Sequence, residues 1–162
     1  MPGNDGKLSA GSSRFVGMFD GRLEDRVGVL VAAEANLRAR RDADVELLQV
    51  ALGWADLHLE ESLPAPADEI EARRRRLADR VGVRMGGAGT PLVMAYCPAE
   101  LGAVLETTYG GARHLIADAL DLRDRLPRLW TTVRQGRVAA WKARRVAAAT
   151  RALTARQVAE GR

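Results

Sequence analysis

Hydrophobic residues recur every three or four positions over long stretches of this chain, which is the spacing of one face of an α-helix. The longest such stretch covers residues 22–63 and contains no proline. Its repeating apolar positions are Val27, Leu30, Val31, Leu37, Val45, Leu48, Leu52, Ala55 and Leu59. One helix of this length spans about 60 Å at 1.5 Å per residue, so we expect either a projecting arm or a break near Arg40–Asp44. In both cases the apolar face needs a partner, from this chain or from a second copy.

Glycines and prolines divide the rest of the chain. Glycine and serine are frequent in residues 1–21, which predicts a mobile leader. Pro64 and Pro66 end the long helix. Residues 64–92 contain four consecutive arginines at 73–76 and the sequence GGAGTP at 86–91, which predicts a charged, flexible linker. Residues 93–162 then form a helical module, and we expect it to be truncated because its pattern stops abruptly at Arg162.

Capping residues mark the helices of this module. We expect five helices. The first begins at Pro98, the second runs from Thr108 to about Arg125, and the third runs from Pro127 to Gly136. The fourth covers 138–153, and the fifth is capped by Thr154. Alanine and leucine favour helices, and aromatic residues make up only 4% of the chain. The sequence therefore predicts an all-α protein. It has a long N-terminal helix or helical arm and a C-terminal bundle of short helices, which contains a helix-turn-helix-like pair.

Residues that carry enzyme chemistry are scarce. Cys97 is the single cysteine, which excludes a disulfide framework and a multi-cysteine zinc site within the chain. The two histidines, His58 and His114, have no metal-ligand spacing, and no phosphate loop or nucleophile motif is present. We expect no catalysis within these residues, no cofactor, no metal and no small-molecule substrate. No apolar run is long enough to span a membrane and no signal peptide is visible, so we expect a cytoplasmic protein.

The helix-turn-helix-like pair lies within residues 96–122. Exposed positions at the start of its second helix are Tyr109, Arg113 and His114, where DNA contact is expected. Residues 98–122 carry a single arginine against Glu100, Glu106, Asp118 and Asp121, and this net charge of −3 repels phosphate. The turn also has Glu106 where a glycine is usual. Shape therefore favours a DNA-reading pair, whereas charge opposes it.

Positive charge is concentrated further along the chain. Residues 123–162 carry 11 basic and 2 acidic side chains, a net of +9, whereas residues 1–122 have a net of −5. If the intervening turn permits, one helical side carries Arg134, Arg137, Trp141, Arg144 and Arg151, flanked by Lys142 and Arg145. Arginines beside an aromatic ring favour contact with nucleic-acid phosphates. The alternative is that Trp141 belongs to the core and the arginines only solvate the opposite side.

Five segments together resemble a known family. They are WADLH (54–58), GGAGTP (86–91), PAELGAVL (98–105), GARHLIADALDLRDRLPRLW (111–130) and GRVAAWKARRVAAATRAL (136–153). The chain resembles, over residues 22–162, the N-terminal domain of actinobacterial HNH-endonuclease-like proteins, called domain of unknown function 222 or the thirteen-E-twelve repeat family. The resemblance implies an all-helical module that precedes an HNH nuclease core. Nothing in these residues matches the histidine-rich element of such a core, so no catalytic residue is implied.

Three functions remain open. The leading expectation is a non-catalytic module that binds or positions DNA in an HNH-endonuclease-like protein. The second is a helical interaction scaffold that associates with itself or another protein through the long helix. The third is a small transcription regulator of the helix-turn-helix type. DNA is the expected partner in the first and third cases, and a second copy of the chain is one partner in the second.

Overall fold

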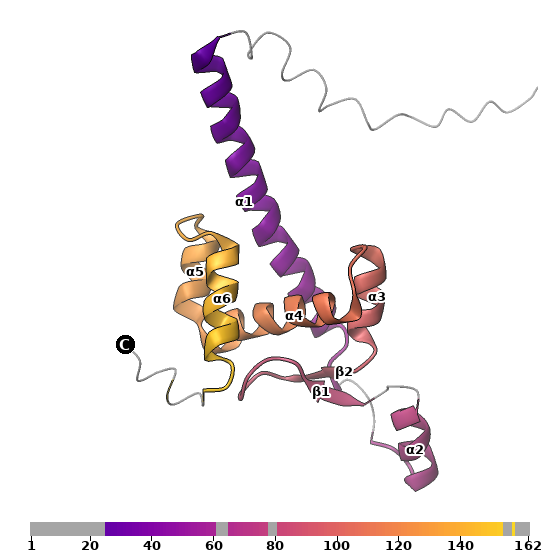
Figure 1. Ribbon diagram of the computed structural model, residues 1–162. Helices are drawn as coiled ribbons and strands as arrows, with labels where there is room; N and C mark the ends of the chain where they lie inside the picture. The colour runs from indigo at the N-terminus through magenta and orange to yellow at the C-terminus, as the bar shows by residue number, and fades with distance from the viewer. Residues whose placement is uncertain (1–24, 61–64, 78–80, 154–156, 158–162) are drawn as a thin grey trace, which may run out of the picture. The chain divides into compact units, whose positions relative to one another are not determined.

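The computed structural model describes residues 25–60, 65–77, 81–153 and 157, and most of them are helical (Figure 1). The elements in chain order are α1 (Arg26–Asp56), α2 (Glu69–Leu77), β1 (Gly82–Arg84), β2 (Leu92–Met94), α3 (Cys97–Val104), α4 (Tyr109–Leu120), the π-helix η3 (Asp121–Arg125), α5 (Pro127–Arg134) and α6 (Ala140–Thr150). The all-α prediction is confirmed, apart from one small hairpin. The expected leader 1–21 and the cap Thr154 lie outside the described residues.

The chain divides into two compact units, residues 1–40 and 41–162. The described part of the first unit is the N-terminal part of α1, and none of its described residues is buried. Its exposed large apolar side chains are Val27, Val29, Leu30, Val31 and Leu37. α1 is helical through Arg40–Asp44, without the break that the sequence left open.

The core of the second unit is built from small and aliphatic side chains on α1, the hairpin and α3 to α6. Among the described residues, every buried hydrophobic residue lies between Leu48 and Ala147. α1 contributes Leu48, Ala51, Leu52 and Ala55. α6 turns Ala140, Ala143 and Ala147 inward, and this spacing of three and four residues puts all three on one face. Because alanine is small, α6 packs close to its neighbours with that face, and its opposite face points to solvent.

The sequence correctly located most helix ends in this unit. Pro98 lies in the first turn of α3, Pro127 begins α5, and Thr108 caps α4 by accepting a hydrogen bond from the Gly111 amide at 3.0 Å. The helical run from Tyr109 ends at Arg125, although its last five residues form a π-helix. Gly136 follows α5 with φ of 71°, the left-handed conformation expected of a glycine just past a helix.

The turn between α3 and α4 explains the unusual Glu106. The amide of Thr107 donates to the Gly102 carbonyl at 2.9 Å, a bond that requires the residue directly before Thr107 to be left-handed. Glu106 takes this conformation with φ of 51°, which is unfavourable for a residue with a Cβ. Glu106 therefore occupies the glycine position of a helix-turn-helix turn.

Glu106→Gly should raise the free energy of unfolding by about 0.5–1 kcal/mol, because glycine adopts this conformation without steric strain. Urea denaturation measures the change. Ala103→Gly, in the same helix with helical backbone, is the control and should lower the free energy by a similar amount. A lower stability of Glu106→Gly would contradict the account of this turn.

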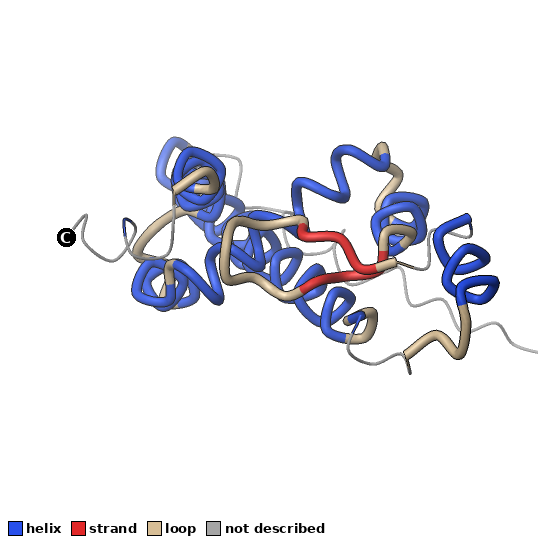
Figure 2. The backbone as a smooth tube through the Cα atoms, turned by 90° about the horizontal axis from the view of Figure 1, so that it is seen from below, coloured by secondary structure: helices blue, strands red, loops and turns tan. Residues whose placement is uncertain are grey.

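The segment predicted to be a flexible linker, 64–92, contains a packed hairpin. β1 and β2 pair antiparallel, with Val83 opposite Val93. The hairpin lies below α4 in Figure 1 and in front of it in Figure 2, which is seen from below. Gly86, Gly87 and Thr90 in the connecting loop are buried. A Cβ at Gly87 would overlap the Arg125 guanidinium, so the glycines allow close packing here rather than flexibility.

Candidate nucleic-acid interface

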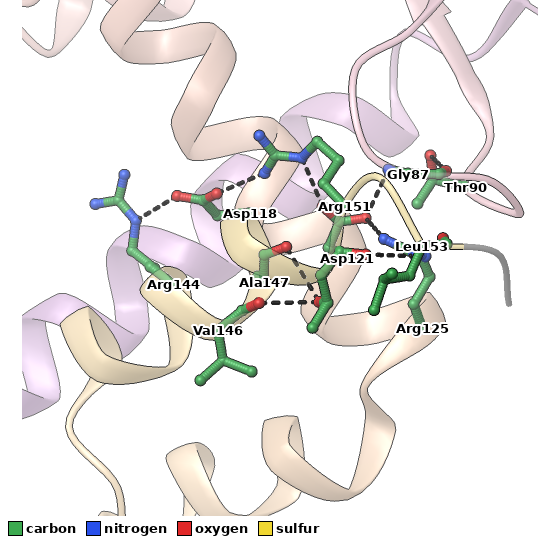
Figure 3. A network of polar contacts seen from close by, with 11 residues as sticks. Gly87, Thr90, Asp118, Asp121, Arg125, Arg144, Val146, Ala147, Arg151 and Leu153 are labelled. Carbon is green, nitrogen blue, oxygen red and sulfur yellow. Dashed lines mark hydrogen bonds and ion pairs between the residues drawn. The ribbon is translucent and has the colours of Figure 1, made fainter. Parts of the chain in front are cut away.

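A buried charge network joins α4, η3 and α6 (Figure 3). Asp121 is fully buried, and its Oδ1 accepts hydrogen bonds from the Gly87 amide at 2.7 Å and from Arg125 at 3.1 Å. Its Oδ2 accepts from Arg151 Nε at 2.8 Å. Asp118, one turn earlier, accepts from Arg151 at 2.6 Å and from Arg144 Nε at 2.8 Å. Two aspartates therefore hold three arginines.

Arg125 is the most buried cation of this network. Its side chain is 2% exposed, and its Nη2 donates to the carbonyls of Thr150 and Leu153 at 3.0 and 2.5 Å. Thr150 is the last residue of α6, where a cation interacts favourably with the helix dipole, and Leu153 lies in the turn that follows. Its Nε has no hydrogen-bond partner among the described residues. The network thus fixes the end of α6 against η3 and the hairpin loop.

This network removes two arginines from the predicted basic stripe, the helical side expected to carry Arg134, Arg137, Trp141, Arg144 and Arg151. Arg144 and Arg151 bind the aspartates, and Arg134 belongs to a different helix, so the five stripe residues do not share one helical side. Burial lowers the pKa of the Arg151 guanidinium, but hydrogen bonds to Asp121 and Asp118 outweigh burial and leave this pKa above its ordinary value. The turn between α5 and α6 breaks the spacing on which the prediction depended.

The same ion pairs weaken the charge argument against the helix-turn-helix pair. Two of the four acidic residues counted there, Asp118 and Asp121, are buried and neutralised by arginines. Only Glu100 and Glu106 remain exposed, against a half-buried Arg113. The surface of α3 and α4 is therefore much less negative than the sequence indicates.

The packing of α3 against α4 has the expected geometry, with Leu101, Gly102, Ala112 and Leu115 buried. At the start of α4, His114 is exposed and Arg113 is half-buried. The exposed Tyr109 uses its hydroxyl to donate to the Ala95 carbonyl at 3.1 Å. Tyr109 is thus already part of the structural contacts at this end of α4.

The remaining stripe residues form an exposed basic face, defined as Arg134, Arg137, Trp141, Lys142 and Arg145. Trp141, Lys142 and Arg145 project from the side of α6 opposite its buried alanines. Arg134 and Arg137 lie at the end of α5 and in the following turn. Within the described part of the chain, none of the four cations makes an ion pair with a carboxylate. Trp141 is 54% exposed, so the part of the second interpretation that places it in the core is wrong.

Acidic residues lie near one end of this face. A cavity of about 270 Å³ is lined by Asp42 and Glu46 of α1 together with Arg134. These carboxylates reduce the positive potential at Arg134. The electrostatic attraction for an anion is therefore carried mainly by Arg137, Lys142 and Arg145.

The described residues also bear on the requirements of a metal site and of a reactive thiol. They hold no group of three or more His, Cys, Asp and Glu side chains placed to bind a metal ion. Burial raises the pKa of the Cys97 thiol to about 12, with Glu100 adding to the effect, so the protonated form is favoured at neutral pH. Among the same residues, no helix combines the length and the apolar character needed to cross a membrane.

The sequence did not lead us to predict this charge network, although two aspartates within an apolar helix indicate it. In the run LIADALDL (115–122), Asp118 and Asp121 interrupt an otherwise apolar helix. Charged residues in such a run are buried only when they are paired. Arg125, four residues after Asp121, is placed to be one partner, but Arg144 and Arg151 are brought in only by the fold.

Comparison with known proteins gives one match. The family described as "Domain of unknown function (DUF222)" matches residues 57–162. No curated protein and no solved structure matches the chain. The matched residues include the charge network and the basic face but exclude α1, which supplies four buried core residues.

Proposed function

Since the chain belongs to the family of domain of unknown function 222, we propose a function from the chemistry of its own surface: a non-catalytic module that binds DNA. The observation that carries this proposal is the exposed basic face on α5, α6 and their turn. Arg137, Lys142 and Arg145 have no carboxylate partner among the described residues, and Trp141 belongs to the same exposed face. Cations placed in this way release counterions when they bind phosphates.

The buried network supports the same proposal by giving the face a fixed position. Asp118 holds Arg144 at the middle of α6, and Arg125 holds its C-terminal carbonyls. A rigid support reduces the entropy lost when a charged surface binds a ligand. In a protein of the HNH-endonuclease type, which the sequence resembles, such a module would hold DNA for a nuclease core in the cytoplasm.

The triple substitution Arg137→Gln, Lys142→Gln and Arg145→Gln tests the proposal. We expect it to weaken binding to a duplex oligonucleotide by at least tenfold at 50 mM salt, measured by fluorescence anisotropy. Arg73→Gln with Arg74→Gln on α2 is the control, because both arginines are exposed and lie outside the face. Equal affinities of the triple variant and the wild type would refute the proposal.

A second candidate, self-association through α1, is favoured by the exposed apolar side chains of the first unit. Leu30 and Leu37 lie seven residues apart and are 60% and 50% exposed. Sedimentation should show a dimer that Leu30→Gln with Leu37→Gln dissociates, whereas Ala35→Gln with Ala39→Gln on the opposite side has no effect. A wild-type monomer at high concentration excludes this candidate. Leu48 and Leu52 are unsuitable probes, because both are buried in the core.

A further inference from the structure

Trp141 differs from the other two tryptophans of the chain. Trp130 is buried, and Trp54 is half-buried with its indole nitrogen donating to the Cys97 carbonyl at 2.9 Å. Trp141 is 54% exposed, and its indole nitrogen has no hydrogen-bond partner among the described residues. A large aromatic surface left in water costs free energy of hydration, so an exposed tryptophan on a rigid helix indicates a contact surface.

One side of this ring faces a small cavity beside the core. Together with Leu47, Leu115 and Arg144, Trp141 lines this cavity, which has a volume of about 50 Å³. Arg144 is itself held by Asp118 at 2.8 Å. One side of the indole therefore faces residues of α1, α4 and α6 across this cavity, and its exposed part faces solvent.

Two cations of α6 lie near the exposed part of the ring, and Asp44 of α1 lines the cavity beside it. The Lys142 ammonium lies over the indole, 5.5 Å from the ring centroid. Arg145 is one helical turn after Trp141 on the same side of α6, and both residues are exposed. A cation–π contact at an exposed site is weak, so a flat aromatic ligand can replace the ammonium on the ring while the ammonium moves to an adjoining anion.

We propose that Trp141 stacks on an unpaired nucleobase, so that the basic face binds single-stranded nucleic acid in preference to duplex. Lys142 and Arg145 then contact the phosphates that flank the stacked nucleotide. An aromatic ring next to cations is the arrangement by which proteins hold single strands without reading sequence. In a blunt duplex the base faces are stacked on one another, so the indole can stack only on the two terminal base pairs. This inference rests on the proposed function and specifies which form of DNA is bound.

The test compares two oligonucleotides, a 20-nucleotide oligothymidine and a blunt duplex of the same length, using fluorescence anisotropy at one salt concentration. Wild type should bind the single strand about tenfold more tightly than the duplex. Trp141→Leu should lose about tenfold for the single strand and little for the duplex, since stacking on one base accounts for roughly that factor. Trp141→Phe, which keeps an aromatic face, should retain most of the affinity. Circular dichroism should show all variants folded, because the replaced ring is mostly exposed.

The outcomes separate this inference from the proposed function. If Trp141→Leu binds the single strand as tightly as wild type while the triple glutamine variant does not, the stacking inference is wrong and the DNA-binding proposal stands. If the triple glutamine variant also binds like wild type, both are wrong. Binding to vesicles of anionic lipid, with neither oligonucleotide bound, would overturn both in favour of a membrane surface. Quenching of tryptophan fluorescence by the single strand, lost in Trp141→Phe, would support stacking directly.

Discussion

Asp121→Asn should lower the free energy of unfolding by about 3–5 kcal/mol, because it removes the charge that Arg125 and Arg151 share in the interior. The substituted side chain has the same shape, so packing is conserved while the buried Arg125 guanidinium loses its only carboxylate partner among the described residues. The loss is a large part of the 5–15 kcal/mol that stabilises a typical domain. Urea denaturation followed by circular dichroism measures it.

Asp56→Asn is the matched control for this prediction. The Asp56 carboxylate also binds an arginine, Arg123, at 2.7 Å, but it is 48% exposed. An exposed pair of this kind contributes about 0–1 kcal/mol. If the two substitutions lower stability equally, then the network around Asp121 does not hold α6 in place, and the rigid support claimed for the basic face is wrong.

A protein of residues 57–162, the range matched by the family, should fail to fold, whereas a protein of residues 41–162 should fold. The shorter chain lacks Leu48, Ala51, Leu52 and Ala55, which are all buried in the core of the second unit. Removing one buried leucine side chain alone costs about 3–5 kcal/mol, so losing this helix exceeds the stability of a typical domain. The longer chain keeps every buried hydrophobic residue that the structure describes.

Thermal unfolding and near-ultraviolet circular dichroism compare the two proteins. We expect a cooperative transition for residues 41–162, and for residues 57–162 either no transition or an insoluble product. A cooperative transition of equal midpoint in both would mean that α1 is dispensable to the core. It would then be free to bind a partner along its whole length, which would favour the scaffold function.

Local sequence rules predicted the helices of the second unit well. Helix ends depend on neighbouring residues, so Thr108, Pro127 and Gly136 could be assigned to caps and starts without knowledge of the fold. The hairpin was missed for the opposite reason. Its glycine-rich loop has the composition of a flexible connection, and its order comes from Asp121 and Arg125, more than thirty residues away.

The candidate site could be predicted only in part. The clustering of Arg137, Lys142 and Arg145 around Trp141 is visible in the sequence, and all four side chains are exposed in the structure. Helical spacing alone could not show that Arg144 and Arg151 form ion pairs while these three cations stay exposed. Arg144 and Arg151 are paired because the fold brings Asp118 and Asp121 next to them. Long-range pairing of charges decides which arginines reach solvent, and periodicity does not contain that information.

The salt dependence of duplex binding tests the central claim most directly, because it counts the phosphates that the protein contacts. Each contact adds about −0.9 to the slope of log K against log salt concentration. If Arg134, Arg137, Lys142 and Arg145 each contact a phosphate, wild type should give a slope of about −3 to −4, and the triple glutamine variant a slope of about −1. The same steep slope for both proteins would show that the DNA contacts lie elsewhere on the molecule.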